Sequence, residues 1–316
     1  PQIIININNI YLNYNMKGYI MQSSKRKEHI KMRMNDYLSV CMFQLKVDLD
    51  CNSQDEYLIE TEETLMQMES AFRIIEKFKP DISLFPEMTY LERYEKKYQE
   101  LSISKIIVAG SYYKNGINTT VVFANGEKRE LAKDYASGAE PMARKITFIS
   151  PKEFLKSKLK NHEFWVKGKK IYILNCMEYY HTAYYMARDE KIKNKLFGIF
   201  TICSNSNTHV FEEETVCIHN HNESLYTFTL NCVSTYKGES YGDGKSYIYG
   251  PVSIHEKEWL VKDGIESKKN ACHVLSLSKD SAQYVYGEFV VYENLSRFGR
   301  SDKYLNNPRN MVVNNL

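Results

Sequence analysis

From Tyr37 onward, short β-like runs alternate with amphipathic helical stretches, and this alternation constrains the fold more than any other feature. In Glu60–Phe78, apolar residues recur at helical spacing, so one face of the predicted helix can pack on a sheet. Further helices are predicted near Thr182–Lys195 and Glu212–Ser224. The pattern therefore predicts an α/β fold.

The predicted strands are short and rich in β-branched and aromatic residues. Within Ile106–Lys133, Asn-Gly turns at Asn115-Gly116 and Asn125-Gly126 separate three of them. The strand ranges are Ser39–Val47, Ile82–Phe85, Ile106–Ser111, Thr119–Ala124, Ile171–Asn175, Leu196–Cys203, Tyr226–Cys232, Ser246–Tyr249 and Val274–Ser278.

Composition excludes several classes of protein. The formal net charge is +3, so no global field steers the chain toward nucleic acid or an acidic membrane. The longest apolar stretch, around Leu196–Cys203, is far shorter than the roughly 20 residues of a membrane-spanning helix. The 7 cysteines are scattered and form no C-x-x-C pair, which argues against a disulfide framework and favours a reducing cytoplasm.

Three segments are predicted. Residues 1–36 form an Asn/Ile-rich extension with basic clusters, 37–300 form the main domain, and 301–316 form a C-terminal tail. The extension is either a peripheral helix or loop, or a contact for RNA or a protein partner. Because the sequence begins with Pro1, a fused or associated N-terminal partner domain is an alternative expectation.

Three reactive residues each follow a predicted strand. Glu87 follows Pro86, Lys133 follows the second hairpin, and Cys176 precedes a helical stretch whose N-terminus favours a thiolate. Taken singly, they read as a solvated acid, a surface lysine and a structural cysteine. Their order, each at a strand end, favours a shared site.

In this context the chain resembles the nitrilase superfamily of carbon–nitrogen hydrolases, whose Glu-Lys-Cys triad lies in three separate motifs. The resemblance covers roughly Tyr37 to Arg300 and implies a four-layer α-β-β-α sandwich, commonly paired into dimers. The motifs are Gln44 on the first strand, Phe85-Pro86-Glu87, Gly110-Ser111, Asn118-Thr119-Thr120, Asn125-Gly126, Gly168 to Glu178, Asn231, Gly242 to Ser246 and Gly250-Pro251.

The resemblance also implies roles for individual residues. Glu87 is the expected general base, Lys133 the cation beside the tetrahedral intermediate and Cys176 the nucleophile, with the Met177 backbone N–H as an oxyanion donor. Glu140 matches a second family glutamate, although a solvated loop acid also fits. The implied reaction hydrolyses a non-peptide carbon–nitrogen bond of a small amide or nitrile through a thioester or thioimidate, without cofactor or metal.

The segment after the nucleophile departs from the family. Many amidases have Phe-Pro-Glu there, whereas this chain has Glu178 and then Tyr179, Tyr180 and His181. The last three are expected either to line the substrate pocket or to pack at a subunit contact. The Cys-x-Glu form leans toward nitrilases, but neither a nitrile nor an amide can be assigned.

Two alternatives remain open from the sequence. Cys217, His219 and His221 have residue types that bind zinc, although on a helix only Cys217 and His221 share a face. The second alternative is functional. The chain could be a nitrilase-like assembly or regulatory domain of a larger protein, as in family domains fused to reverse transcriptases in bacterial defence.

Overall fold

The computed structural model describes residues 37–52, 55–138, 140, 149–193, 196–221, 225–250, 272–291 and 308–316. The extension 1–36 lies outside the described residues. Within the described part the strands form three sheets of seven, six and four strands. Among these residues no helix combines the length and apolar character needed to cross a bilayer.

The seven-stranded sheet has the order β17-β16-β1-β4-β5-β6-β7, with β1, β4 and β5 parallel. Its strands are β1 (Tyr37–Gln44), β4 (Ile82–Leu84), β5 (Ile106–Lys114), β6 (Ile117–Ala124), β7 (Glu127–Ala132), β16 (Gln283–Val290) and β17 (Arg309–Asn315). The segment 301–316, expected as a tail, therefore contributes an edge strand that pairs with β16.

The six-stranded sheet has the order β15-β14-β11-β10-β9-β8, with β9, β10 and β11 parallel. Its strands are β8 (Glu163–Val166), β9 (Lys169–Asn175), β10 (Leu196–Cys203), β11 (Tyr226–Asn231), β14 (Tyr247–Gly250) and β15 (Cys272–Ser276). The predicted bounds of Leu196–Cys203 are confirmed.

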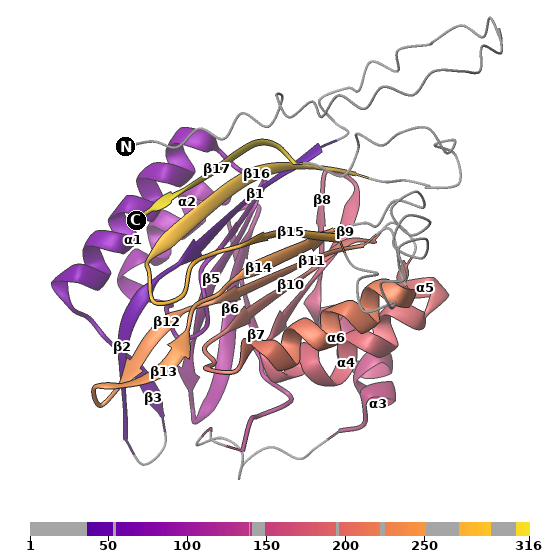
Figure 1. Ribbon diagram of the computed structural model, residues 1–316, viewed down its shortest axis with the longest axis horizontal. Coiled ribbons are helices and arrows are strands. Elements are labelled where there is room, and N and C mark those ends of the chain that lie inside the picture. Colours follow the sequence, from indigo (N-terminus) through magenta and orange to yellow (C-terminus); the bar gives the residue numbers. More distant parts are fainter. Residues whose placement is uncertain are drawn as a thin grey trace, which may run out of the picture.

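A third, smaller sheet joins distant parts of the chain. It has the order β13-β12-β2-β3, with β2 (Lys46–Cys51), β3 (Glu56–Ile59), β12 (Val233–Tyr236) and β13 (Glu239–Asp243). Figure 1 draws it at the lower left. The single strand expected over Ser39–Val47 is interrupted at Leu45, and β2 pairs with β12 instead of continuing β1.

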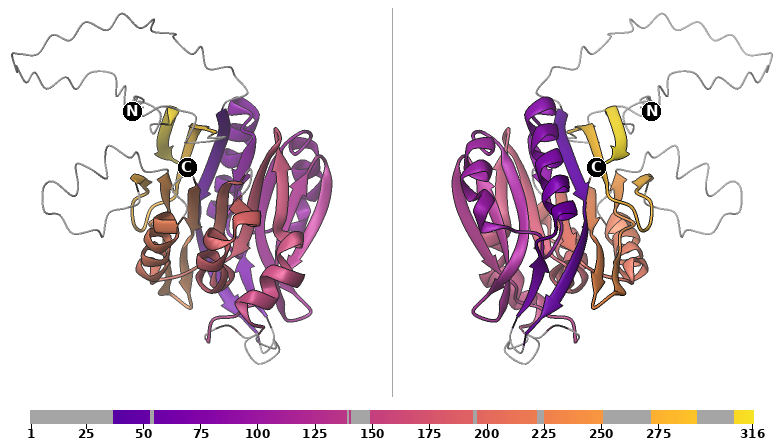
Figure 2. Two further views of the ribbon diagram at one scale, coloured as in Figure 1. Left: turned by 90° about the vertical axis from the view of Figure 1, so that its right-hand side faces the viewer. Right: turned by 90° about the vertical axis from the view of Figure 1, so that its left-hand side faces the viewer.

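Helices cover the outer faces of the two large sheets. They are α1 (Glu62–Phe78), α2 (Glu95–Leu101), α3 (Pro151–Ser157), α4 (Met177–Arg188), α5 (Glu190–Lys193) and α6 (Thr208–His221), with 3-10 turns at Glu92–Tyr94 and Leu159–His162. The left-hand view of Figure 2 faces α4 and α6, and the right-hand view faces α1. Helix α4 begins five residues before the expected Thr182, and α6 before the expected Glu212.

Three apolar clusters hold these layers together. The central one fills the space between the large sheets, where Phe200 and Phe228 stack with ring centroids 4.4 Å apart. On the first sheet, Phe72 of α1 packs on Phe85. On the second, α4 and α6 cover the outward side chains of β9 and β10. Burial of this much apolar surface is the main force that fixes a helix–sheet–sheet–helix order.

Candidate active site

The candidate site is a cavity of about 240 Å³ at one end of the sheets, where several parallel strands finish. Strands β1, β4 and β5 run in one direction, and the two hairpins give β7 the same direction. Glu87, which follows β4, and Lys133, which follows β7, therefore lie at the same edge of the seven-stranded sheet. The lining residues are Glu56, Glu87, Met88, Lys133, Ser137, Glu140, Cys176, Ser204, Asn205, Ser206, Ser240 and Tyr241.

Glu87 is buried and satisfied by three donors. Its Oε1 accepts from Lys133 Nζ at 2.7 Å and from Asn118 Nδ2 at 2.8 Å, and its Oε2 accepts from the Ser204 backbone N–H at 2.8 Å. Burial raises the pKa of the Glu87 carboxyl, and Lys133 offsets part of that rise. A carboxyl group whose pKa is raised from its ordinary value is better suited to accept and return a proton near neutral pH.

The Glu87 loop depends on a glycine opposite it. Gly110 has a φ of 95°, and a Cβ there would lie 2.6 Å from the Pro86 carbonyl oxygen. Ser111, the next residue, bonds to the same loop, because its Oγ accepts a hydrogen bond from the Met88 backbone N–H at 3.0 Å. The Gly110-Ser111 segment therefore packs closely against the Pro86–Met88 loop and holds Glu87 in position.

Lys133 lies between two carboxylates. Its side chain is fully buried, and its Nζ is 2.7 Å from Glu87 Oε1 and 2.7 Å from Glu140 Oε1. Burial acts to lower the pKa of Lys133, but Glu140 and Glu87 outweigh burial and raise it well above the ordinary value. The ammonium is therefore permanent at neutral pH, and it also attracts negative charge on Cys176.

Cys176 occupies a strained turn between β9 and α4. Its φ of 46° and ψ of −105° are unusual for a residue with a side chain. The Cys176 backbone N–H still bonds the Ile202 carbonyl at 2.9 Å, which continues the β9–β10 pairing. The turn directs the thiol into the cavity at the start of α4, where the first backbone N–H groups have no intrahelical partner. Met177 is the first of them.

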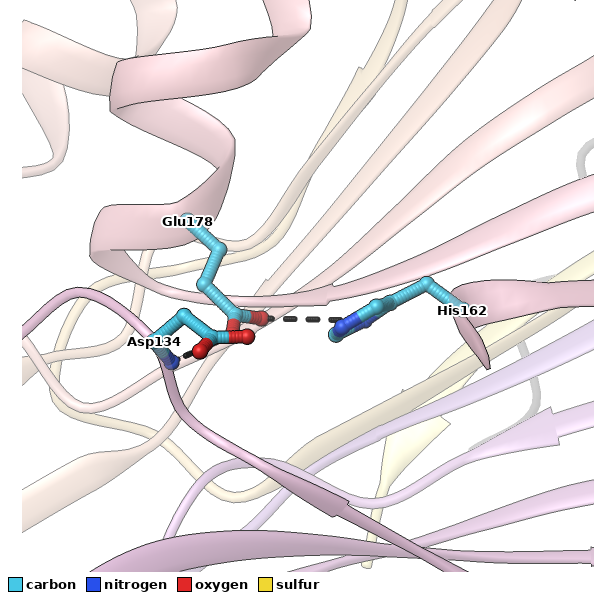
Figure 3. A group of neighbouring side chains, drawn as sticks. All are labelled: Asp134, His162 and Glu178. Atoms are coloured by element: carbon cyan, nitrogen blue, oxygen red, sulfur yellow. Dashed lines mark hydrogen bonds and ion pairs between the residues drawn. The ribbon is translucent and has the colours of Figure 1, made fainter. Parts of the chain in front are cut away.

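Glu178 ties the Lys133 loop to the Cys176 turn, a function that sequence reasoning missed. Its Oε1 accepts the Asp134 backbone N–H at 2.9 Å and its Oε2 accepts the Asn175 backbone N–H at 2.9 Å. Figure 3 shows the carboxylate between Asp134 and His162. Since Asp134 follows Lys133 and Asn175 precedes Cys176, one buried carboxylate sets the spacing of both segments.

Replacing Glu178 by glutamine is expected to loosen this tie. An amide nitrogen cannot accept a hydrogen bond, so one buried backbone N–H loses its acceptor, at a cost of about 1–3 kcal/mol in the free energy of unfolding. Urea denaturation measures the change, and slower alkylation of Cys176 in the folded variant would mark a shift of the turn. The exposed Glu100→Gln provides the control, expected within about 0.5 kcal/mol of the parent. An equal free energy of unfolding for Glu178→Gln and the control would contradict the role of Glu178 in joining the two loops.

Asp134, His162 and Glu178 also offer ligand atoms within 4.8 Å of one another, a spacing that a metal ion could bridge. Their existing contacts account for the cluster without one. Both Glu178 oxygens accept backbone N–H groups, and His162 Nδ1 is 2.9 Å from the Ile173 carbonyl. We therefore assign the cluster to the tie between the two loops.

Several motif residues prove to be supports for the cavity. Gln44 donates to the Ser278 and Ser281 carbonyls, and its Oε1 accepts the Ser246 N–H at 2.9 Å. Asn231 donates to the Asn205 carbonyl at 2.7 Å and accepts the Asn205 N–H at 2.8 Å. The two Asn231 bonds hold the Ser204–Asn205 segment, whose first N–H is bonded to Glu87.

The expected pocket residues Tyr179, Tyr180 and His181 do not line the cavity. Tyr179 is buried and its hydroxyl lies 2.6 Å from Thr215 of α6, while His181 stacks on Tyr135. Tyr180 is 39% exposed. All three residues lie on the first turns of α4, and a role for them in substrate binding or at a subunit contact stays a prediction.

The zinc alternative also receives no support. Cys217 is exposed on α6, whereas His219 is buried and its Nε2 lies 3.1 Å from Thr227 Oγ1. Burial lowers the pKa of His219 to about 3. Cys217 and His219 thus face different surroundings; the His221 side chain lies outside the described residues.

Similarity to known proteins is found at the level of the fold. No family model matches the sequence, and the search of curated proteins gives no match. Among solved structures, the chain is similar to a CN-hydrolase superfamily protein from Xanthomonas campestris with an arsenic adduct in its active site. The TM-score is 0.53 at 10% identity, with 80% of this chain and 90% of that chain covered.

The chain is also similar to an amidase from Nesterenkonia sp., with a TM-score of 0.46 at 12% identity and coverage of 90% and 92%. The expected fold class is confirmed: the chain has the mixed α/β sandwich of nitrilase-superfamily structures. At 10% identity the likeness concerns the fold, and the roles of the site residues stay predictions.

Proposed function

We propose that this protein is a carbon–nitrogen hydrolase that uses Cys176 as nucleophile and acts on a small amide or nitrile. The observation that carries the proposal is a buried Glu87–Lys133–Glu140 ion cluster that shares one cavity with a cysteine in a strained turn. Burying three charges has a large cost, so such a cluster is expected where chemistry uses it.

The proposed reaction begins when Glu87 takes the Cys176 proton and the thiolate attacks the substrate carbon. Negative charge develops on the substrate oxygen or nitrogen, and the Lys133 ammonium with the Met177 N–H stabilises it. For an amide, Glu87 returns the proton to the leaving nitrogen, which departs as ammonia or an amine and leaves a thioester. For a nitrile, Glu87 returns the proton to the nitrogen of the thioimidate, and a first water, deprotonated by Glu87, adds to the thioimidate before ammonia departs and the thioester forms. Water, deprotonated by Glu87, then cleaves the thioester and releases the acid. Glu140 holds Lys133 in place throughout.

The proposal also concerns the cellular compartment and the cofactor requirement of the enzyme. A reducing cytoplasm keeps a catalytic thiol free, and the six cysteines whose side chains the structure describes are free thiols. The chemistry needs neither metal nor cofactor. Pairing of two chains stays a prediction.

Site-selective labelling tests the proposal without a known substrate. With limiting iodoacetamide, Cys176 should be alkylated first although it is only 4% exposed. Cys217 is the exposed competitor, but partial burial with Glu214 and Glu213 raises its pKa. Burial likewise raises the pKa of Cys41, Cys203 and Cys232. Peptide mass spectrometry gives the order of reaction. If Cys217 is labelled preferentially and Cys176 does not react, the result would favour the alternative in which the chain is an assembly or regulatory domain without catalytic activity.

A further inference from the structure

The candidate cavity carries more negative than positive groups. Among its described lining residues, Glu56, Glu87 and Glu140 are carboxylates and Lys133 is the only ammonium. Lys133 is already bonded to Glu87 and Glu140 at 2.7 Å each. Glu56 therefore has no cation of its own among the described residues, and the proposed reaction gives it no task.

Glu56 enters the cavity from the small third sheet. It is the first residue of β3, and its side chain is 9% exposed. Its Oε1 accepts the Tyr241 hydroxyl at 3.3 Å, a long hydrogen bond from β13. No other partner of the Glu56 carboxylate is found in the described part of the chain. A buried carboxylate with one long hydrogen bond is poorly satisfied, and such a group gains most from a ligand that brings donors or positive charge.

The groups that face Glu56 come from several elements. Burial raises the pKa of Glu56 to about 7, Glu87 and Glu140 add to the rise, and Tyr241 and Lys133 oppose it. Tyr113 of β5 and Tyr241 remain neutral, because burial raises the pKa of each hydroxyl further above its ordinary value. Glu56 is therefore charged at pH 8 and mostly neutral at pH 6.

We infer that the substrate carries a protonated amine or another cationic group distant from the bond that is cleaved, and that Glu56 binds this cation. The inference rests on the proposed function, since it assigns the same cavity a class of substrate. A cation beside Glu56 would offset part of the excess negative charge of the cavity, whereas an anionic substrate would meet three carboxylates. The cavity volume, about 240 Å³, lies below the roughly 300–1,000 Å³ of sites for drug-sized ligands and suits a small molecule.

Charged thiol reagents measure this preference directly at Cys176. Aminoethyl methanethiosulfonate is cationic and sulfonatoethyl methanethiosulfonate is anionic. Each transfers its alkylthio group to a thiolate, which forms a mixed disulfide and expels methanesulfinate. The two rates at Cys176 are read by peptide mass spectrometry and divided by the corresponding rates with 2-mercaptoethanol. At pH 8 and low salt, the normalised cation-to-anion ratio should be about tenfold or more.

Glu56→Gln should lower that ratio by about tenfold, because it keeps the shape of the side chain and removes one charge next to the cavity. Glu239→Gln is the matched control. Glu239 lies on β13 of the same sheet but is exposed and does not line the cavity, so the ratio should stay unchanged. In the parent protein the ratio should also fall from pH 8 to pH 6 as Glu56 takes up a proton, and this fall should shrink in Glu56→Gln.

The outcomes separate the two proposals. If Cys176 reacts readily but with equal normalised rates, or if Glu56→Gln leaves the ratio unchanged, the cationic substrate is ruled out and the hydrolase proposal stands. If Cys176 reacts with neither reagent while Cys217 does, the hydrolase proposal fails and the inference fails with it. The pH comparison in the parent protein needs no variant, so a Glu56→Gln chain that does not fold still leaves the inference testable.

Discussion

Cys176→Ala is expected to reduce hydrolysis by at least about 10⁴-fold, because the serine hydroxyls that also line the cavity are much weaker nucleophiles than a thiolate. Among the described lining residues, Cys176 is the only thiol. Ammonia release from acetamide, propionitrile and 4-aminobutanamide provides the assay, and the last of these carries the cation inferred above. Loss of ammonia release with every substrate that the parent protein hydrolyses is the expected result.

The fold should survive this change. Alanine removes only the sulfur atom, so the free energy of unfolding should change by about 1 kcal/mol. Cys41→Ala is a suitable control, since Cys41 is buried on β1 and does not line the cavity. Turnover that persists in Cys176→Ala but disappears in Cys41→Ala would overturn the assignment of the nucleophile.

Lys133→Met is expected to destabilise the protein by about 3–5 kcal/mol at pH 8, because it leaves buried carboxylates without their cation. Burial already raises the pKa of Glu87, and Lys133 is the largest influence that opposes the rise. Without Lys133 the pKa of Glu87 rises further above its unfolded value. The folded variant then binds a proton more tightly than the unfolded chain, so stability returns as the pH falls.

Urea denaturation at pH 8 and pH 6 measures this effect as the difference between parent and variant. The difference should shrink at pH 6. Lys97→Met removes an exposed lysine that pairs with Glu76, and it should cost at most about 1 kcal/mol at either pH. A Lys133→Met deficit as small as that of the control, or one that grows toward pH 6, would contradict the role of Lys133 as the buried counter-ion.

The sequence predicts the elements that carry Glu87, Lys133 and Cys176 because strand ends have strong local signals. Pro86 ends one strand, Asn125-Gly126 turns the next, and the run before Cys176 is continuous and apolar. Each signal lies within a few residues of the side chain it positions. The sandwich fold, and the end of the sheets at which the cavity lies, follow from these local patterns together with the resemblance to the nitrilase superfamily.

Glu56 and Glu178 could not be found in this way. Glu56 lies on a four-residue strand that pairs with the nearby β2, but Tyr241, which it meets in the cavity, is 185 residues away, so no local pattern marks Glu56 as part of a cavity. The task of Glu178 depends on two backbone N–H groups, which the sequence does not distinguish from any others. Tyr179 to His181 were expected before a helix that starts near Thr182, but α4 begins at Met177, because the sequence signal for a helix start is weaker than that for a strand end.

The small third sheet has a consequence for how the chain folds. Asp48 of β2 is hydrogen-bonded to Thr235 of β12, 187 residues further along the chain. Closing a loop of this length is entropically costly, and contacts between distant segments slow folding. During synthesis, β2 and β3 emerge long before the strand that pairs with β2 in parallel. The small sheet that carries Glu56 therefore cannot complete its pairing until β12 has been synthesised.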